Sequence, residues 1–201
     1  MKTTIYLIRH GTTDWNEAGR YQGSSDIPLN QKGLEESKKT GESLSKIPFN
    51  AIYSSPLIRA RKTAEEIARH HSLPIVFVEE LKERSYGLME GLSFKEIEHH
   101  PHFKKNTGKN WYLLGSPDGE SFKDASRRVD RAFSNIVYKH PRESIAIVAH
   151  GGVIKSVGFN IGYFNLKNIS KVLIPNAHPI IIEYSHIEKG YTVVDFPFTI
   201  K

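Results

Sequence analysis

Two short apolar runs, far apart in the chain, each lead into the dipeptide His-Gly. Residues 5–8 are followed by Arg9 and His10, and residues 145–149 are followed directly by His150. A short apolar run bounded by a turn signal is typical of a strand buried on both faces of a parallel sheet. Open α/β sheets bind ligands at the carboxyl ends of such strands, where glycine lets the backbone turn and approach a ligand. We therefore expect the two histidines to meet in one crevice.

The composition excludes several classes of protein. The chain has 201 residues, enough for a sizeable core, and no cysteine, which excludes disulfides, thiolate catalysis and cysteine-ligated metals. Hydrophobic residues make up 38% and the mean hydropathy is −0.43. No apolar stretch approaches the ~18 residues that span a bilayer, and the first residues lack the pattern of a signal peptide. We expect a cytoplasmic protein that does not engage a membrane.

The net charge of +6 and the pI of about 9.4 fit a nucleic-acid partner, an anionic surface or small anionic substrates. The positive residues are spread along the chain, without a zinc-finger pattern, an RNA-binding signature or a basic arm. We expect a small phosphorylated metabolite as the partner and no nucleic acid. The pair Arg127 and Arg128 falls on the polar face of a predicted helix, which indicates solvated surface. The sequence does not indicate the oligomeric state.

Strand and helix patterns alternate along the rest of the chain. This order predicts a three-layer α/β/α fold with a mostly parallel central sheet. We expect a single domain over residues 1–201, with an irregular, pocket-covering insertion at about 92–120. Besides the two runs above, strands are predicted at 51–54, 75–78 (buried), 179–184 and 191–196. Helices are predicted at 31–45 after the cap Asn30, from Pro56 to about 70, from the cap Ser93 to before Pro101, from the cap Ser121 onward, and at 151–160.

Five segments, in order, resemble the histidine phosphatase superfamily in its phosphoglycerate-mutase-like branch, and within it the short bacterial phosphatases of broad specificity. The resemblance covers about residues 4–157 and implies the fold of that branch. The chain departs from it at Thr12, where related sequences commonly carry Glu. The matching segments are Arg9, His10 and Gly11 with Trp15 and Asn16; Gln22 and Gly23 with residues 26–29; residues 54–60 with Thr63 and Ala64; residues 81–87 with Glu90 and Gly91; and residues 149–151.

The resemblance implies a role for each matching residue. His10 resembles the nucleophile that becomes phosphohistidine. Arg9, Arg59 and His150 resemble the phosphate pocket, and Glu83 resembles the proton donor, although its run of charged neighbours by itself indicates ordinary surface. Supporting contacts with phosphate or substrate are implied for Asn16, Gln22, Gly23 and Gly151.

These residue types suit phosphoryl transfer. The reaction needs in-line positioning and stabilisation of the charge on the equatorial oxygens, and the planar fork of arginine bonds two oxygens at once. We expect two arginines and a cationic His150 to replace a metal ion, so that no cofactor is required. Their positive charge should keep His10 neutral, as a nucleophile must be. Glu83 would protonate the leaving alkoxide and later act as a base.

The first expectation is a metal-independent phosphatase acting on small phosphomonoesters. The alternative is a 2,3-bisphosphoglycerate-dependent phosphoglycerate mutase, which must cover its pocket against water. Only about 60 residues separate Gly91 from His150, and no arginine lies between Arg84 and Arg127. Both observations favour the phosphatase. A third possibility, a binding protein with an inactive pocket, is disfavoured because the reactive set is complete.

The insertion contains two further features. A histidine group resembles a metal site, but it straddles Pro101 and lacks consistent ligand spacing, so we expect no metal there. Aromatic residues of the same segment could line the pocket rim and set specificity, or form local core. The histidines are His99, His100 and His102, and the aromatic residues are Phe103, Trp111 and Tyr112.

Overall fold

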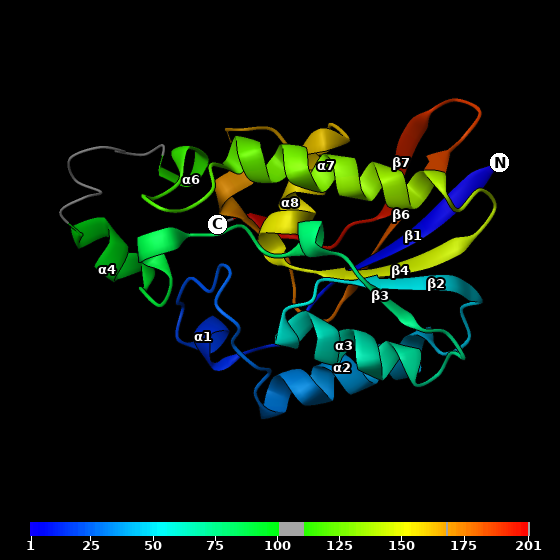
Figure 1. The fold of residues 1–201 in the computed structure, drawn as a ribbon, viewed down its shortest axis with the longest axis horizontal. Coiled ribbons are helices and arrows are strands. Elements are labelled where there is room, and N and C mark those ends of the chain that lie inside the picture. Colours follow the sequence, from blue (N-terminus) through cyan, green and yellow to red (C-terminus); the bar gives the residue numbers. More distant parts are fainter. Residues whose placement is uncertain (101–110, 168, 201) are drawn as a thin grey trace.

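The computed structural model describes residues 1–100, 111–167 and 169–200 (Figure 1). Its main sheet has the strand order β3-β2-β4-β1-β6-β7. The strands from β3 to β1 run parallel, whereas β6 is antiparallel to β1 and β7 to β6. The predicted mostly parallel sheet is therefore confirmed. The strands are β1 (Lys2–Arg9), β2 (Phe49–Ser54), β3 (Ile75–Phe77), β4 (Ser144–Ala149), β6 (Pro179–Ser185) and β7 (Gly190–Asp195).

Helices cover both faces of the sheet, which confirms the three layers. Helices α2 (Gln31–Leu44) and α3 (Ile58–Ala68) lie on one face, and α7 (Phe122–Tyr138) and α8 (Gly151–Asn160) lie on the other (Figure 1). The apolar residues of β1 and β4 alternate between the two cores, because successive strand residues point to opposite faces. Asn30 caps α2 as predicted, accepting a hydrogen bond from the N–H of Gly33.

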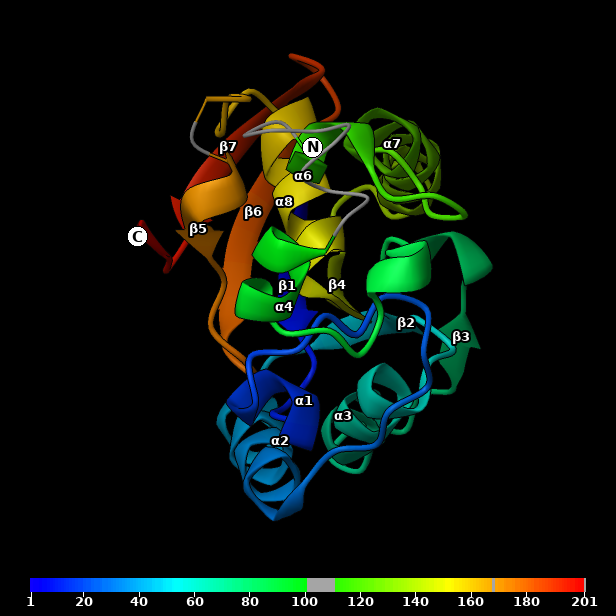
Figure 2. The ribbon, with the colours of Figure 1, turned by 90° about the vertical axis from the view of Figure 1, so that its left-hand side faces the viewer.

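The register of the two central strands brings the histidines together. Arg9 at the end of β1 is paired with Ala149 at the end of β4, and the N–H of His10 donates to the carbonyl oxygen of Ala149 at 3.0 Å. The carboxyl ends of both strands thus open at the same edge of the sheet. Helices α1 (Asp14–Glu17), α4 (Phe94–His99) and α6 (Trp111–Leu114) lie beyond this edge (Figures 1 and 2).

The remaining elements are short. Among the described residues, the 3₁₀ turns η1 (Glu79–Leu81), η2 (Gly87–Met89) and η4 (Ile169–Lys171) connect the larger elements. Strands β5 (Val172–Leu173) and β8 (Thr199–Ile200) pair with each other in a separate antiparallel ribbon. In the part of the chain that the structure describes, no helix has the length and apolar character that crossing a membrane requires.

Three predictions about elements are wrong in detail. Strand β3 forms an edge of the sheet, so Val76 and Phe77 are 44% and 48% exposed where a buried strand was expected. Pro56 lies outside helix α3, because Leu57 has an extended backbone and occupies the N-cap position. The segment expected to be irregular contains α6 within its described part, while residues 101–110 lie outside the described residues.

Candidate active site

His10 follows β1 directly and is only 3% exposed. Its Nδ1 lies 2.7 Å from the carbonyl oxygen of Gly11. A carbonyl oxygen can only accept, so Nδ1 carries the proton and Nε2 keeps the lone pair in the neutral ring. Burial, followed by the charges of Arg9 and Arg59, lowers the pKa of His10 well below its usual value. The imidazole is therefore neutral, as the sequence predicted.

His150 occupies the N-cap of α8, fully buried, with its ring centroid 5.2 Å from that of His10. Its Nε2 lies 2.7 Å from Oγ of Ser55, at the end of β2. Burial, then the charges of Arg59, His10 and Arg9, lower the pKa of His150 well below its usual value. Without a bound anion His150 is therefore neutral, because burial and the flanking arginines both disfavour its charged form.

Arg59 projects from the first turn of α3 and is fully buried. Its Nη1 and Nη2 donate to the carbonyl oxygens of Ser25 and Gly23, each at 2.7 Å. Burial lowers the pKa of Arg59 to about 10, so the guanidinium remains charged at neutral pH. Arg9, at the end of β1, is fixed in the same way, since its Nη1 donates to the carbonyl oxygen of Ile174 at 2.7 Å.

Several buried polar atoms from distant segments have no hydrogen-bond partner among the described residues. Four of them belong to residues that the sequence assigned to the site: Nε of Arg9, Nε of Arg59, Nδ1 of His150 and Oε1 of Gln22. An unsatisfied buried polar group costs about 1–3 kcal/mol, so native proteins rarely leave several together without a purpose. Two cationic donors beside two neutral rings suit an anion that accepts hydrogen bonds, and a phosphate group has that chemistry.

Glu83 reaches this cluster from the chain after η1. Its Oε2 accepts a 2.9 Å hydrogen bond from the N–H of Gly152, in the first turn of α8, and its Oε1 accepts a 2.8 Å bond from the N–H of Arg84. A Cβ atom on Gly152 would overlap Oε1 of Glu83, so only glycine allows this approach. Glu83 therefore lies against the first turn of α8 and is partly buried, whereas Glu80 in the same charged run is exposed.

The loop that contains Gly23 is held on one side by Arg59 and on the other by Glu90. The Glu90 carboxylate accepts hydrogen bonds from the N–H and hydroxyl groups of Ser24 and Ser25 and from the N–H of Tyr86. Burial raises the pKa of Glu90, but these donors, with Ser25 first, outweigh burial and the net shift is downward. Gly23 has a φ of +52°, and a Cβ there would overlap Glu90.

The two asparagines at the site have different tasks. Asn16 forms a capping box with Thr13 in α1, and its Oδ1 accepts from the N–H of Thr13 at 3.1 Å. Asn176, which sequence reasoning missed, donates from Nδ2 to the carbonyl oxygen of His10 at 2.8 Å and lies 3.5 Å from Oδ1 of Asn16. No motif surrounds Asn176, so only its spatial position identifies it.

Two threonines tie the segment after His10 to the neighbouring helices. The hydroxyl of Thr63 accepts from the N–H of Gly11 at 3.0 Å and donates to the carbonyl oxygen of Arg59 at 2.9 Å. Thr12, at the position where the chain departs from related sequences, donates from its N–H and hydroxyl groups to the Glu36 carboxylate at 2.9 and 2.8 Å. Both residues position the pocket from outside it.

The solvated-surface prediction holds for Arg127, which is exposed, and is wrong for Arg128. Arg128 donates from Nε and Nη2 to the Glu120 carboxylate at 2.8 and 2.6 Å. Its Nη1 donates to the carbonyl oxygens of Glu80 and Lys82, at 2.6 and 3.1 Å. Arg128 therefore anchors the segment that carries Glu83 onto α7.

The histidines of the insertion form no metal cluster in the described part of the chain, which holds no group of three or more potential ligands. His99 ends α4 and His100 caps it. His102 and Phe103 lie outside the described residues, and Trp111 and Tyr112 lie in α6.

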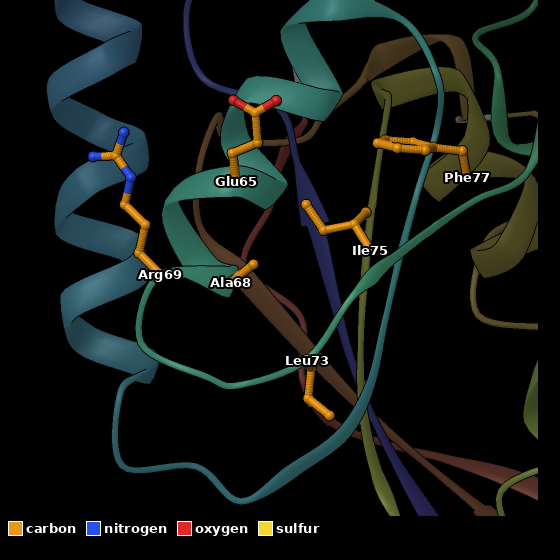
Figure 3. Close-up of a pocket in the computed structure, with 6 residues that line it drawn as sticks. All are labelled: Glu65, Ala68, Arg69, Leu73, Ile75 and Phe77. Carbon is orange, nitrogen blue, oxygen red and sulfur yellow. The ribbon is translucent and has the colours of Figure 1, made fainter.

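A surface pocket of about 580 Å³ lies elsewhere, between α3 and the edge strand β3 (Figure 3). Its lining is mostly apolar and includes Leu73, Ile75 and Phe77, together with the charged residues Arg69 and Glu65. It contains none of the predicted site residues. The buried cluster around His10 is therefore the candidate active site, and this pocket is separate from it.

Known proteins resemble the chain over most of its length. The sequence model of the histidine phosphatase superfamily (branch 1) matches residues 5–195. The uncharacterized phosphatase PhoE of Bacillus subtilis (strain 168) is 36% identical over 155 residues, which cover 77% of this chain and 75% of that protein. The metal-independent phosphoserine phosphatase of Arabidopsis thaliana is 39% identical over 163 residues, 79% of this chain and 68% of that protein.

The structural comparison agrees with the sequence comparison. The structure of Bacillus stearothermophilus YhfR superposes with a TM-score of 0.84 and 32% identity, covering 96% of each chain. Phosphoglycerate mutases are also among the similar proteins, so both activities of the family are represented. The resemblance drawn from the five segments is confirmed, and the chain belongs to the histidine phosphatase superfamily, branch 1, as an enzyme of that family.

Proposed function

We propose that this enzyme is a metal-independent phosphatase that hydrolyses small phosphomonoesters of the cytoplasm through a phosphohistidine on His10. The observation that carries the proposal is the tautomer of His10: its Nδ1–H is engaged by the Gly11 carbonyl, which leaves the Nε2 lone pair for attack. The buried donors of Arg9 and Arg59 lie in the same cluster and suit the phosphoryl group.

In the first step, Nε2 of His10 attacks phosphorus and the bond from phosphorus to the ester oxygen breaks. Arg9 and Arg59 hold the equatorial oxygens and stabilise their charge. Glu83 supplies the proton that the leaving alkoxide needs. His150 is neutral beforehand; the negative charge of a bound phosphoryl group would favour its protonation, so that Nδ1 donates as well.

In the second step, a water oxygen attacks phosphorus and the bond from phosphorus to Nε2 breaks. Glu83 takes the proton of the water, His10 recovers its lone pair, and inorganic phosphate leaves. The protein supplies all the positive charge, which is why no metal ion enters either step.

The test is to trap the phosphoenzyme with p-nitrophenyl phosphate. Wild type should give an acid-labile, alkali-stable adduct, and His10→Ala should give neither the adduct nor turnover. The matched control is His70→Ala, which changes an exposed histidine just after α3, at the end of the helix opposite Arg59. This variant should behave as wild type. Near wild-type labelling of His10→Ala would assign the nucleophile to another residue.

The mutase is the second candidate, because mutases are among the relatives. A mutase must keep water away from phosphohistidine and hold a second phosphoryl group with further cations. Of the adjacent arginines in the first half of α7, Arg127 is exposed and Arg128 is already paired with Glu120 at 2.6 Å, which favours hydrolysis. The test supplies 3-phosphoglycerate with catalytic 2,3-bisphosphoglycerate and follows 2-phosphoglycerate and free phosphate. Isomerisation about tenfold faster than phosphate release would favour the mutase.

A further inference from the structure

The hydroxyl group of Ser55 contacts the ring of His150 from the end of a neighbouring strand. Ser55 follows β2 directly, and its N–H donates to the carbonyl oxygen of Val148 in β4 at 2.9 Å. Its Oγ lies 2.7 Å from Nε2 of His150, and both residues are fully buried. The pairing of β2 with β4 therefore holds the hydroxyl against one nitrogen of the His150 ring.

The hydroxyl hydrogen of Ser55 has a single acceptor among the described residues, and that acceptor is Nε2 of His150. The other contact of Oγ is with the N–H of Leu57 at 3.3 Å, and there Oγ can only accept. If Nε2 carried the proton, it would be a second donor to Oγ, and the buried hydroxyl hydrogen would have no acceptor in the described part of the chain. A buried donor without a partner is unfavourable, so Ser55 donates and Nε2 of the neutral ring accepts.

This contact decides where the proton of His150 lies. A neutral imidazole has one N–H group, and because Nε2 accepts, the proton is on Nδ1. Nδ1 of His150 is buried without a partner among the described residues, like Nε of Arg9 and Nε of Arg59. The ring lies beside that of His10, with 5.2 Å between the two centroids. The neutral ring therefore adds a buried N–H donor to those of the two arginines, next to His10.

We infer that Ser55 is a positioning residue whose hydroxyl fixes the tautomer of His150, so that the neutral ring presents Nδ1–H to an oxygen of the phosphoryl group. The inference rests on the proposed function, since it takes a phosphoryl group as the occupant of the cluster. The opposite tautomer would turn a lone pair toward the same oxygen and repel it. The arrangement provides the donor even though burial and the arginines lower the pKa of His150. A proton taken up after binding would go to Nε2 and leave Nδ1–H in place.

The experiment observes the tautomer in resting enzyme with ¹⁵N-labelled histidines, by two-bond ¹H–¹⁵N correlation NMR at pH 7. The His150 signals are those that are missing from the spectrum of His150→Gln. Wild type should show Nδ1 protonated and Nε2 unprotonated. Ser55→Ala should show both tautomers, because neither nitrogen then has a partner among the described residues. The control is Ser54→Ala, which removes an equally buried hydroxyl that donates to the Ser55 carbonyl oxygen, and it should keep the wild-type tautomer.

A second measurement links the tautomer to anion binding. Isothermal titration calorimetry with inorganic phosphate gives the affinity of the resting enzyme for the anion, without turnover. Ser55→Ala should bind phosphate about tenfold more weakly than wild type, which is the scale of one hydrogen bond. Ser54→Ala should bind phosphate as wild type does.

The outcomes separate this inference from the proposed function, because neither measurement requires catalysis. A wild-type spectrum with the proton on Nε2 would overturn the role of Ser55 and leave the proposed function standing. So would a Ser55→Ala variant with the wild-type tautomer or phosphate affinity, or an equal loss in Ser54→Ala. Absence of a phosphoenzyme in wild type would overturn the proposed function, whatever the tautomer. If Ser55→Ala does not fold, as judged by circular dichroism, Ser55→Cys takes its place with the same expected changes, since a thiol is a weak donor.

Discussion

Nη2 of Arg59 donates a 2.7 Å hydrogen bond to the carbonyl oxygen of Gly23, and thereby joins helix α3 to the loop at the pocket. The same guanidinium leaves a buried Nε without a partner among the described residues. One side chain therefore fixes the loop and, in the proposed mechanism, also offers a donor to the substrate. This double use makes the shape of the guanidinium as important as its charge.

Arg59→Lys should lower kcat/KM on p-nitrophenyl phosphate by about 10²-fold, because an ammonium cannot replace several hydrogen bonds of a planar fork. Steady-state kinetics measures the loss, and circular dichroism checks the fold. Arg61→Lys, on the same helix but exposed, is the matched control and should retain activity. Equal activity of the two variants would mean that Arg59 contributes charge alone.

Glu83→Gln should slow alkyl phosphates by roughly 10²-fold or more and p-nitrophenyl phosphate much less, because a good leaving group needs no proton. The measurement compares kcat/KM for the two ester types. Glu80→Gln, an exposed change in the same charged run, should leave both unchanged. Equal losses on both esters would remove Glu83 from the acid role.

Gly152→Ala should reduce turnover by about 10²-fold, since its Cβ would overlap the Glu83 carboxylate and displace it from the helix terminus. The expected signature is a larger loss for alkyl phosphates than for p-nitrophenyl phosphate, as for the Glu83 variant. Gly190→Ala is the control, because nothing lies within 4 Å of the Cβ there. Unchanged turnover would show that activity does not depend on the contact between the Glu83 carboxylate and the helix terminus.

Glu90→Gln should lower the free energy of unfolding at pH 7 by about 2–3 kcal/mol, because hydrogen bonds to a carboxylate are stronger than those to an amide. The pKa of Glu90 is lower in the folded state, so its contribution is present above the unfolded value and disappears as pH falls through the folded value. Urea unfolding from pH 7 to pH 3 measures this, with exposed Glu98→Gln as the control. The difference between wild type and Glu90→Gln should shrink on the acid side; a difference independent of pH would assign the loss to packing.

Removal of metal should change the rate little, because the proposed steps use only charges of the protein. The measurement adds EDTA to metal-stripped enzyme and follows hydrolysis of p-nitrophenyl phosphate. A large loss that magnesium or zinc restores would contradict the mechanism.

Some features of this protein followed from its sequence alone. The two apolar runs before His10 and His150 predicted parallel strands, because a chain that is apolar at successive positions can only be buried on both faces. Asn30 and Ser93 predicted helix starts, because capping depends on residues three positions apart. The ordered segments identified the family, and with it the residues that meet at the sheet edge.

Other features were decided only by the tertiary structure, because they depend on groups that are close in space and distant in sequence. The neutral state of His150 is one, since burial of its ring and the charge of Arg59 together lower its pKa. The pairing of Arg128 with Glu120 is another, since nothing in a helical pattern reveals an acceptor arriving from outside the helix. The exposure of β3 followed from its place in the strand order, and the contact of Asn176 with His10 from a loop without any periodic signal. Local patterns predict which elements form; long-range packing determines what each side chain meets.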